Sequence, residues 1–422
     1  MSSGPDVAVI ADDLTGAADT GVQFAAIGAP VYLMPVATLS LERPWLATAT
    51  GISLYTATRD LSAPEAGEQV RLAAQALSDP HPRWIYKKTD SCLRGNLGAE
   101  IDVLLDTLGL DIALVAPALP AQGRTTLGGI HRVYGIPLAQ TQFASDPLTP
   151  VTCSSVAEVL AHQSRYGIGR VGVDNYDDPE RLQGAVQRER TRGCRLIVCD
   201  AVTQTHLDKL AALVVQSAER LLPVGSAGLA ASLVGQLASR RMVEPVPVSG
   251  PERLLMVCGT GAQATREQLD ALLSKYPGVC HKLTFEWLVT ASVRDRRRCA
   301  DELLAAWTGG VLVLRVRSLP SASSMSELKR AAAGLGRLAL EFIRAGPVDG
   351  LFLSGGETAD AVRRAACGEA IELQQEILPG LVLGRWVGGV ADGLPVVTKA
   401  GAFGDKQTLV ALYERLVGGV GL

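Results

Sequence analysis

The feature that most constrains the fold is a repeated order: a short apolar run, a polar or glycine-rich segment, then a helical pattern. Apolar runs occur at 7–11, 30–34, 51–55, 84–87, 112–116, 170–174, 196–200, 222–226, 254–258, 311–314 and 350–353. Continuous apolar runs are typical of parallel strands, which are buried on both faces. Helical patterns at 65–77, 98–108 and 205–220 lie between such runs. The chain is therefore predicted to be α/β with mainly parallel sheets.

A proline-rich segment interrupts this order near the middle of the chain. Residues 243–251 contain Pro245, Pro247 and Pro251, and proline does not fit a helix interior or a central strand. We interpret the segment as a linker between two α/β domains, residues 1–242 and 252–422, with a substrate cleft between them.

Composition excludes several classes of protein. The 422 residues carry a formal net charge of −3, which argues against a general nucleic-acid binder and against a basic membrane-binding surface. The 8 cysteines form no CxxC pair, so a zinc ribbon is not expected. No signal-peptide pattern begins the sequence and no apolar run is long enough to cross a membrane. We therefore expect a cytoplasmic protein with reduced thiols.

Charged side chains follow the first apolar run and the run at 84–87. Asp12 and Asp13 come directly after the first strand, where paired carboxylates need a metal, a lysine or a hydroxyl group as a partner. The plainer interpretation is a solvated turn with a helix cap. Residues 87–96 combine lysines, an arginine and hydroxyl groups, which suit a small polyhydroxylated anion, or else form a charged surface loop. Arg59 follows another predicted strand. It is equally well interpreted as a substrate-binding residue or as an ordinary surface arginine.

Glycine-rich segments dominate the second half of the chain. They lie at 258–262, 354–359 and 398–405, and the first two come at the ends of the apolar runs at 254–258 and 350–353. Glycines at the start of a helix let backbone N–H groups approach a phosphate. The segments lack the P-loop pattern, and tight turns are the alternative interpretation of each. Together they favour a nucleotide site.

Taken jointly, these segments resemble the four-carbon acid sugar kinase family. The resemblance is carried by Ala-Asp-Asp-Leu-Thr-Gly-Ala at 11–17, Lys-Thr-Asp-Ser-Cys-Leu-Arg-Gly-Asn at 88–96, Ser-Asp-Pro-Leu-Thr-Pro at 145–150, Ser-Gly-Gly-Glu-Thr at 354–358 and Thr-Lys-Ala-Gly-Ala-Phe-Gly-Asp at 398–405. It extends in order from residue 7 to about residue 410. It implies an acid-sugar-binding N-terminal domain, a nucleotide-binding C-terminal domain, and phosphorylation of the 4-hydroxyl of a four-carbon acid by ATP with Mg²⁺.

The resemblance also implies roles for individual residues. Our own mechanistic hypothesis is that Asp12 or Asp90 accepts the hydroxyl proton, with Asp12 favoured because it closes the first strand. The substrate-binding residues would be Asp12, Arg59, Lys87, Lys88, Thr89, Asp90 and Arg94. The ATP-contacting residues would be Thr260, Gly355, Gly356, Glu357, Thr358, Lys399, Gly401 and Gly404. Metal ligands are not assigned.

The sequence departs from the family pattern at two places. Cys92 stands where the family has threonine, and the turn at 259–262 is not serine-rich. The second departure leaves open whether Thr260, Ala262 or the backbone alone contacts the nucleotide.

The expected reaction is phosphorylation of D-threonate, and 3-oxo-tetronate or erythronate is the alternative substrate. A non-catalytic sugar-acid or nucleotide sensor is a further alternative. A nicotinamide-dependent oxidoreductase is disfavoured, because the segment after residue 11 lacks a GxGxxG pattern. Sugar acid and ATP are the expected partners, without nucleic acid or membrane, and a homodimer is a possible assembly.

Overall fold

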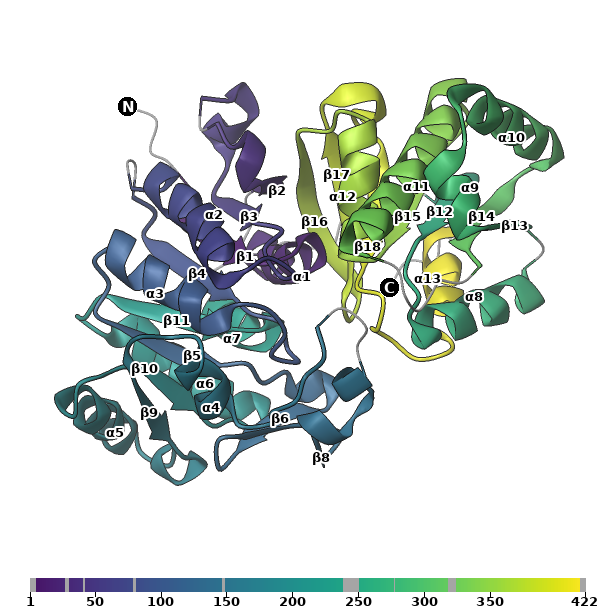
Figure 1. Cartoon of the computed structure of the whole chain (residues 1–422). Helices are drawn as coiled ribbons and strands as arrows, with labels where there is room; N and C mark the ends of the chain where they lie inside the picture. Colours follow the sequence, from purple (N-terminus) through teal and green to yellow (C-terminus); the bar gives the residue numbers. More distant parts are fainter. Residues whose placement is uncertain are drawn as a thin grey trace. The chain divides into compact units, whose positions relative to one another are not determined.

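The chain forms two compact units, Met1–Val243 and Glu244–Leu422, in the computed structural model shown in Figure 1. The structure describes residues 5–26, 30–40, 42–78, 81–145, 149–237, 250–276, 278–317 and 324–417. Both units are α/β, which confirms the predicted fold class. Most of the predicted linker, and residues 146–148 of the segment at 145–150, lie outside the described residues.

The first unit contains a parallel sheet with strand order β2-β3-β1-β4-β11-β5-β10-β9. Its strands are β1 (Val7–Ala11), β2 (Val31–Pro35), β3 (Gly51–Tyr55), β4 (Trp84–Lys88), β5 (Ile112–Ala116), β9 (Gly167–Val171), β10 (Cys194–Cys199) and β11 (Leu221–Gly225). From β1 the chain continues to β2 and β3, which lie on one side of β1 in the sheet. From β3 it crosses over β1 to β4, which lies on the other side. The strand order therefore reverses at β1, where open parallel sheets bind their ligands.

Helices cover this sheet on both faces. On one face α1 (Leu14–Ala25) packs against α7 (Ala227–Leu237), which also contacts α6 (Gln204–Gln216). On the other face α2 (Ala63–Ala76) packs against α3 (Leu97–Thr107), which contacts α4 (Val156–Ala161). Helix α5 (Pro179–Thr191) packs on β9 and β10. This double cover explains why the strands are apolar on both faces.

A small antiparallel sheet, which was not predicted from the sequence, follows β5. It consists of β6 (Arg124–Leu127), β7 (Ile130–Val133) and β8 (Ile136–Pro137). The backbone N–H groups of Gly128 and Gly129 donate to the buried carboxylate of Asp200, at 2.8 and 2.9 Å. These bonds anchor the small sheet beside the end of β10.

The second unit contains a sheet with strand order β13-β14-β12-β15-β18-β17-β16. Its strands are β12 (Arg253–Cys258), β13 (Val279–Leu283), β14 (Gly310–Val316), β15 (Gly350–Ser354), β16 (Ala370–Leu378), β17 (Leu381–Val387) and β18 (Pro395–Lys399). Strands β12 to β15 and β18 are parallel, and β17 pairs antiparallel with both β16 and β18. The strand order reverses between β12 and β15.

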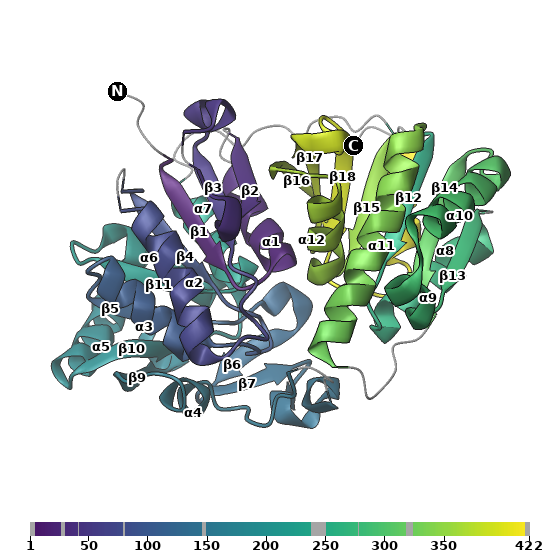
Figure 2. The same cartoon turned by 45° about the horizontal axis from the view of Figure 1, so that its top comes forward.

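Helices also cover both faces of the second sheet. Helices α9 (Phe285–Thr290), α10 (Val293–Ala306) and α12 (Gly356–Ala365) pack against α11 (Met325–Ala345), and Figure 2 shows α11 beside α12. Helices α8 (Gln263–Lys275) and α13 (Thr408–Val417) pack together over an apolar core that includes Met256, Phe352 and Leu412. Short 3-10 helices occupy Val36–Thr38, Pro44–Thr48, Pro120–Gln122, Leu138–Gln140, Gln142–Ser145, Val173–Asn175 and Gly389–Ala391.

Among the described residues, no helix has the length and apolar character needed to cross a bilayer.

Candidate active site

The charged segments of the first unit meet where β1, β3 and β4 end. Ala11, the last residue of β1, pairs with Tyr55 of β3 and with Lys88 of β4. Because parallel strands end at the same edge, the residues that follow them are brought together. Asp12, Arg59 and Asp90 accordingly lie in one cluster, as the sequence suggested.

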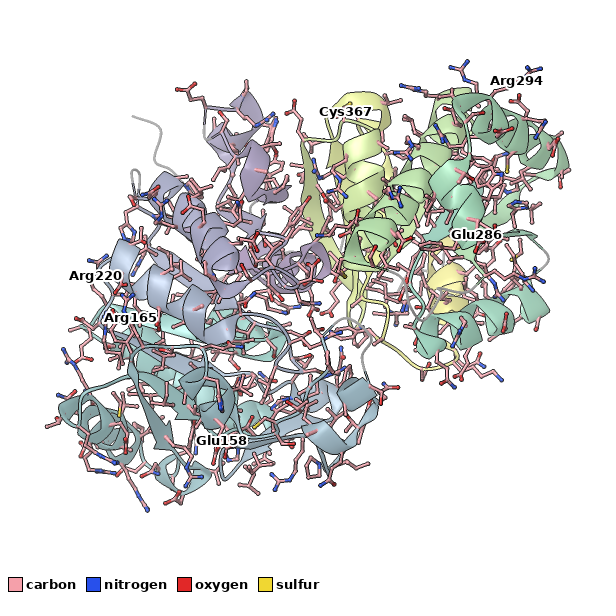
Figure 3. The ribbon with its side chains drawn as sticks, in the orientation of Figure 1. Glu158, Arg165, Arg220, Glu286, Arg294 and Cys367 are labelled. Carbon is pink, nitrogen blue, oxygen red and sulfur yellow. The ribbon has the colours of Figure 1, made fainter. Side chains whose placement is uncertain are left out.

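Arg59 is the centre of this cluster. Its Nε donates to Asp12 Oδ2 at 2.6 Å, and its Nη2 lies 2.9 Å from Asp13 Oδ1 and 3.7 Å from Asp90 Oδ1. Burial by itself would lower the pKa of Arg59, but these carboxylates raise it well above its ordinary value. The side chain is 20% exposed. Arginines such as Arg165 and Arg294, by contrast, lie on the outside of the molecule in Figure 3. Arg59 is therefore a permanent cation inside the site.

Asp12 is buried, at 3% exposure, and only one of its oxygens is engaged. Within the described residues, Asp12 Oδ1 and the nearby hydroxyl of Thr89 have no hydrogen-bond partner. Gly95 lies against this carboxylate with a φ of 96°, and a Cβ added there would fall 3.4 Å from Asp12 Oδ2. A buried polar atom without a partner is costly, so its presence here points to a ligand.

Asp90 is occupied by the protein itself. Arg94 donates to it in a fork, with Nε 2.8 Å from Oδ2 and Nη2 3.0 Å from Oδ1. The backbone N–H groups of Cys92 and Arg94 also donate to Oδ2. Burial would raise the pKa of Asp90, but Arg94 and Arg59 hold it well below its ordinary value. Asp90 therefore organises the loop and is a weak proton acceptor.

The two lysines differ in their surroundings. The ammonium of Lys87 is fully buried and lies 2.6 Å from Glu100 on α3, which also accepts from the Thr58 hydroxyl at 2.6 Å. Lys88 points to the other face of β4, where its Nζ donates to the carbonyl of Thr89. A Cβ at Gly16 would come within 2.9 Å of that Nζ, so glycine leaves room for it. The charge of Lys88 acts on Asp13 and Asp90 and lowers the pKa of both carboxyl groups.

Asp13 is both a helix cap and the partner of a cation, the two interpretations that the sequence left open. Its Oδ1 accepts from the N–H of Gly16 at 2.9 Å, which makes it the N-cap of α1. The same oxygen pairs with Arg59. Burial would raise the pKa of Asp13, but Arg59 and Lys88 lower it below its ordinary value.

Sequence reasoning missed His131. This fully buried side chain on β7 bridges the Thr126 hydroxyl and the carbonyl of Ser91, each at 2.9 Å. Burial lowers its pKa to about 4, so the ring is neutral. An isolated histidine in the sequence carried no signal for this contact, because Ser91 lies 40 residues away.

The three glycine segments of the second unit also meet. They follow β12, β15 and β18, which are neighbours in the sheet. A Cβ added at Gly401 would fall 2.5 Å from the Thr260 hydroxyl, and one at Gly259 would fall 2.5 Å from the Thr358 hydroxyl. Gly355 has a φ of 97° and packs on Thr260 as well. The close approach of these loops explains the glycines.

The remaining residues predicted to contact ATP have distinct positions. Gly356 begins α12 and Glu357 occupies its first turn, with its carboxylate 3.2 Å from Arg364 of the same helix. Gly404 has a φ of 84° and packs on Thr408. Lys399 is buried, and its Nζ faces the carbonyl oxygens of its own loop. The structure thus brings the glycines and threonines together. The carboxylate of Glu357 instead pairs with Arg364, and the ammonium of Lys399 donates to carbonyl oxygens of its own loop.

We also tested whether the described residues fit a metal ion. No three His, Cys, Asp or Glu side chains among them are grouped so that they could hold one. Mg²⁺ commonly binds through substrate phosphates and waters with few protein ligands. The residues present therefore fit a metal carried by a nucleotide better than one held by the chain alone.

Two family models match two separate parts of the chain. A family model described as a sugar-binding N-terminal domain matches residues 7–233, and one described as a nucleotide-binding C-terminal domain matches residues 255–409. A D-threonate kinase of Salmonella typhimurium is 34% identical over 96% of this chain and 97% of its own length. A D-erythronate kinase of Heliobacterium modesticaldum is 33% identical over 98% and 97%.

Solved structures show the same fold. A protein from Salmonella typhimurium LT2 superimposes with a TM-score of 0.80 at 23% identity, covering 96% of this chain and 98% of its own. A protein of unknown function from Bordetella bronchiseptica, described as a domain-swapped dimer with bound citrate, has 31% identity and a TM-score of 0.50, with 98% of each chain covered.

The fold and the two sites define a two-domain protein that binds a sugar in one unit and a nucleotide in the other. The chain belongs to the four-carbon acid sugar kinase family. This membership confirms the kinase class expected from the sequence and excludes the oxidoreductase interpretation.

Proposed function

We propose that the chain transfers the γ-phosphoryl group of ATP to the 4-hydroxyl of D-threonate. The observation that carries this proposal is the buried Asp12 carboxylate, whose Oδ1 has no partner among the described residues. Such an oxygen can accept the proton of a substrate hydroxyl as that hydroxyl attacks phosphorus. The relatives named above act on D-threonate or D-erythronate, so both acids belong in the test.

The choice of Asp12 over Asp90 as the base follows from their partners. Both Asp90 oxygens accept from Arg94, and its lowered pKa makes it a poor proton acceptor. Asp12 keeps one free lone-pair direction, while Arg59 fixes its other oxygen. Asp90 then acts as a positioning residue for Arg94.

The acid group of the substrate would bind to the cations around this carboxylate. Arg59 makes no hydrogen bond through Nη1 within the described part of the chain. Lys88 and Arg94 supply further donors, and the Thr89 hydroxyl can bind a sugar hydroxyl. Lys87 would contribute indirectly, because its ammonium is paired with Glu100.

ATP would bind where the loops after β12, β15 and β18 meet. Thr260, Gly355, Gly356, Thr358 and Gly401 leave space there because their side chains are small, and the start of α12 favours anions. The N–H of Gly355 itself donates to the Lys399 carbonyl at 2.8 Å. Mg²⁺ bound to the phosphates would neutralise charge that develops on them. Transfer requires the acid and ATP to meet with water excluded.

The test is ADP release from purified protein with MgATP and, separately, D-threonate, L-threonate, D- and L-erythronate and 3-oxo-tetronate. Turnover with D-threonate at the highest kcat/KM supports the proposal, and a preference for another acid corrects the substrate. Thermal stabilisation by ATP and an acid without turnover would instead support the sensor. No stabilisation by any of them in folded protein would contradict the proposal entirely.

We further propose a homodimer in the cytoplasm, where ATP is available. The dimeric description of the Bordetella relative supports the first part. Light scattering on purified protein gives the mass directly, and one chain has 44.3 kDa.

A further inference from the structure

The ammonium of Lys399 is enclosed by oxygen atoms. Its Nζ donates to the carbonyl oxygens of Ala400, Gly401 and Phe403 at 3.0, 3.3 and 3.1 Å, and it lies 3.2 Å from the Thr265 hydroxyl. The side chain is 1% exposed. An ammonium has three N–H donors, and these acceptors use all of them. Lys399 therefore has no donor left for a phosphate while the loop keeps this shape.

The polar side chains beneath the loop support the same arrangement. The Thr265 hydroxyl donates to the Gly401 carbonyl at 2.8 Å, and Gln268 donates to the Phe403 carbonyl at 2.9 Å. Both belong to α8. The loop carbonyls thus face inward onto the lysine and α8.

Inward carbonyls fix the direction of the next amides. In a trans peptide the C=O and the following N–H point in opposite directions. The carbonyls of Ala400, Gly401 and Phe403 face Lys399, so the N–H groups of Gly401, Ala402 and Gly404 face away from it. These N–H groups have no hydrogen-bond partner in the described ranges of the chain. Successive outward amides form an anion-binding concavity.

We propose that Lys399 is an internal cation that turns the amides of Gly401, Ala402 and Gly404 outward as a cradle for the nucleotide phosphates. Lys399 is then a positioning residue that does not touch the phosphate. This inference rests on the proposed nucleotide site and deepens it, because it names the groups that hold the anion.

The charge on Lys399 is not balanced by a carboxylate within the described residues. Burial lowers its pKa to about 8. The titratable group that faces it is Cys258, at the end of β12, and burial raises the pKa of that thiol to about 12. The neutral amine would present a lone pair to the loop carbonyls, so the cradle requires the ammonium. A bound polyphosphate stabilises the ammonium and raises its pKa, and nucleotide binding therefore takes up a proton near pH 8.

The test uses the full chain and a non-hydrolysable ATP analogue with Mg²⁺, followed by calorimetry from pH 7 to 9. We expect the affinity of the wild type to fall above pH 8, by up to about tenfold per pH unit. Proton uptake at pH 8 should appear as a binding enthalpy that depends on the buffer. K399M should bind at least about tenfold more weakly at pH 7 and should lose the pH dependence. K275M, at an exposed lysine on α8, should behave as the wild type.

The outcomes separate this inference from the proposed function. A wild type that binds the analogue equally at pH 7 and 9 without proton uptake overturns the role of Lys399, even if K399M fails to fold. A folded K399M that binds as tightly as the wild type overturns it too. A folded wild type that binds no nucleotide at any pH overturns the nucleotide site itself.

Discussion

His131 Nε2 lies 2.9 Å from the carbonyl oxygen of Ser91 and joins the small antiparallel sheet to the loop that carries Asp90. A neutral imidazole can donate to this carbonyl while its Nδ1 accepts from the Thr126 hydroxyl. The loop that carries Asp90 is therefore held by β7, a strand that contributes no side chain to the charged cluster itself.

Replacing His131 should change how the stability of the protein depends on pH. Its folded pKa of about 4 lies below the ordinary value of 6.5, so the unfolded chain binds the extra proton first as pH falls. Stability is then lost between pH 6.5 and about 4, by up to about 3 kcal/mol. Urea unfolding at pH 7, 6 and 5 should show a smaller loss in H131Q than in the wild type. Equal losses in both would contradict the assignment.

Asp12 and Asp90 should differ in which kinetic constant they affect. D12N removes the proton acceptor, so kcat should fall by at least about 100-fold with little change in KM for the acid. D90N releases Arg94 and should mainly raise KM. Steady-state ADP release checks both. If D12N retained wild-type kcat, Asp12 would not be the base.

Arg59 should not be replaceable by lysine. R59K keeps the charge but cannot pair with Asp12 and Asp13 in the same geometry, so KM for the acid should rise about tenfold or more. R71K, at an exposed arginine on α2, is the matched control and should leave KM unchanged. Equal KM values for R59K and the wild type would remove Arg59 from the substrate site.

Lys87 and Glu100 should be coupled in stability. E100Q leaves the fully buried Lys87 ammonium without its carboxylate, which should cost about 3–5 kcal/mol of unfolding free energy. The double variant K87M/E100L removes both charges and should recover much of that loss. Urea unfolding of the three proteins measures the coupling. Because Lys87 Nζ also donates to the Lys88 carbonyl at 2.9 Å, a mild effect of E100Q alone would contradict the expected dependence of Lys87 on Glu100.

Gly401 should tolerate no side chain. G401A places a Cβ 2.5 Å from the Thr260 hydroxyl, so the loops after β12 and β18 must separate and KM for ATP should rise about tenfold. G235A is the control, because a Cβ there meets nothing within 4 Å and alanine favours a helix. Its KM for ATP should match that of the wild type, and its melting temperature should match or exceed the wild-type value.

Much of the fold was predictable because apolar runs mark buried parallel strands directly. The strands at 51–55 and 112–116 were predicted to the residue, and Asp12 was correctly expected at a strand end. The small sheet was missed, since β6 to β8 are short strands of mixed polarity with four residues or fewer. Strands β16 and β17 were missed as well.

The directions in which side chains point could not be predicted from the sequence. Lys87 and Lys88 are adjacent and chemically equal, yet alternation along β4 sends one to Glu100 and the other toward Asp13. Lys399 looked like a phosphate ligand, but the fold directs it into its own loop. These outcomes depend on which residues of distant segments are brought opposite each other, and residue type alone does not encode that.

Arg59 is paired with Asp12 and Asp13, two carboxylates of its own chain that would compete with the proposed acid substrate for the guanidinium. An arriving anion must displace, or share the guanidinium with, carboxylates that cannot diffuse away. A simple anion makes only one contact, with Arg59, and so gains little binding free energy over the carboxylates that it displaces. A hydroxylated acid can satisfy the arginine, the unpartnered Asp12 oxygen and the Thr89 hydroxyl together. Under the proposed function, this pairing would by itself favour hydroxylated acids over other anions, whether or not a phosphate donor is bound.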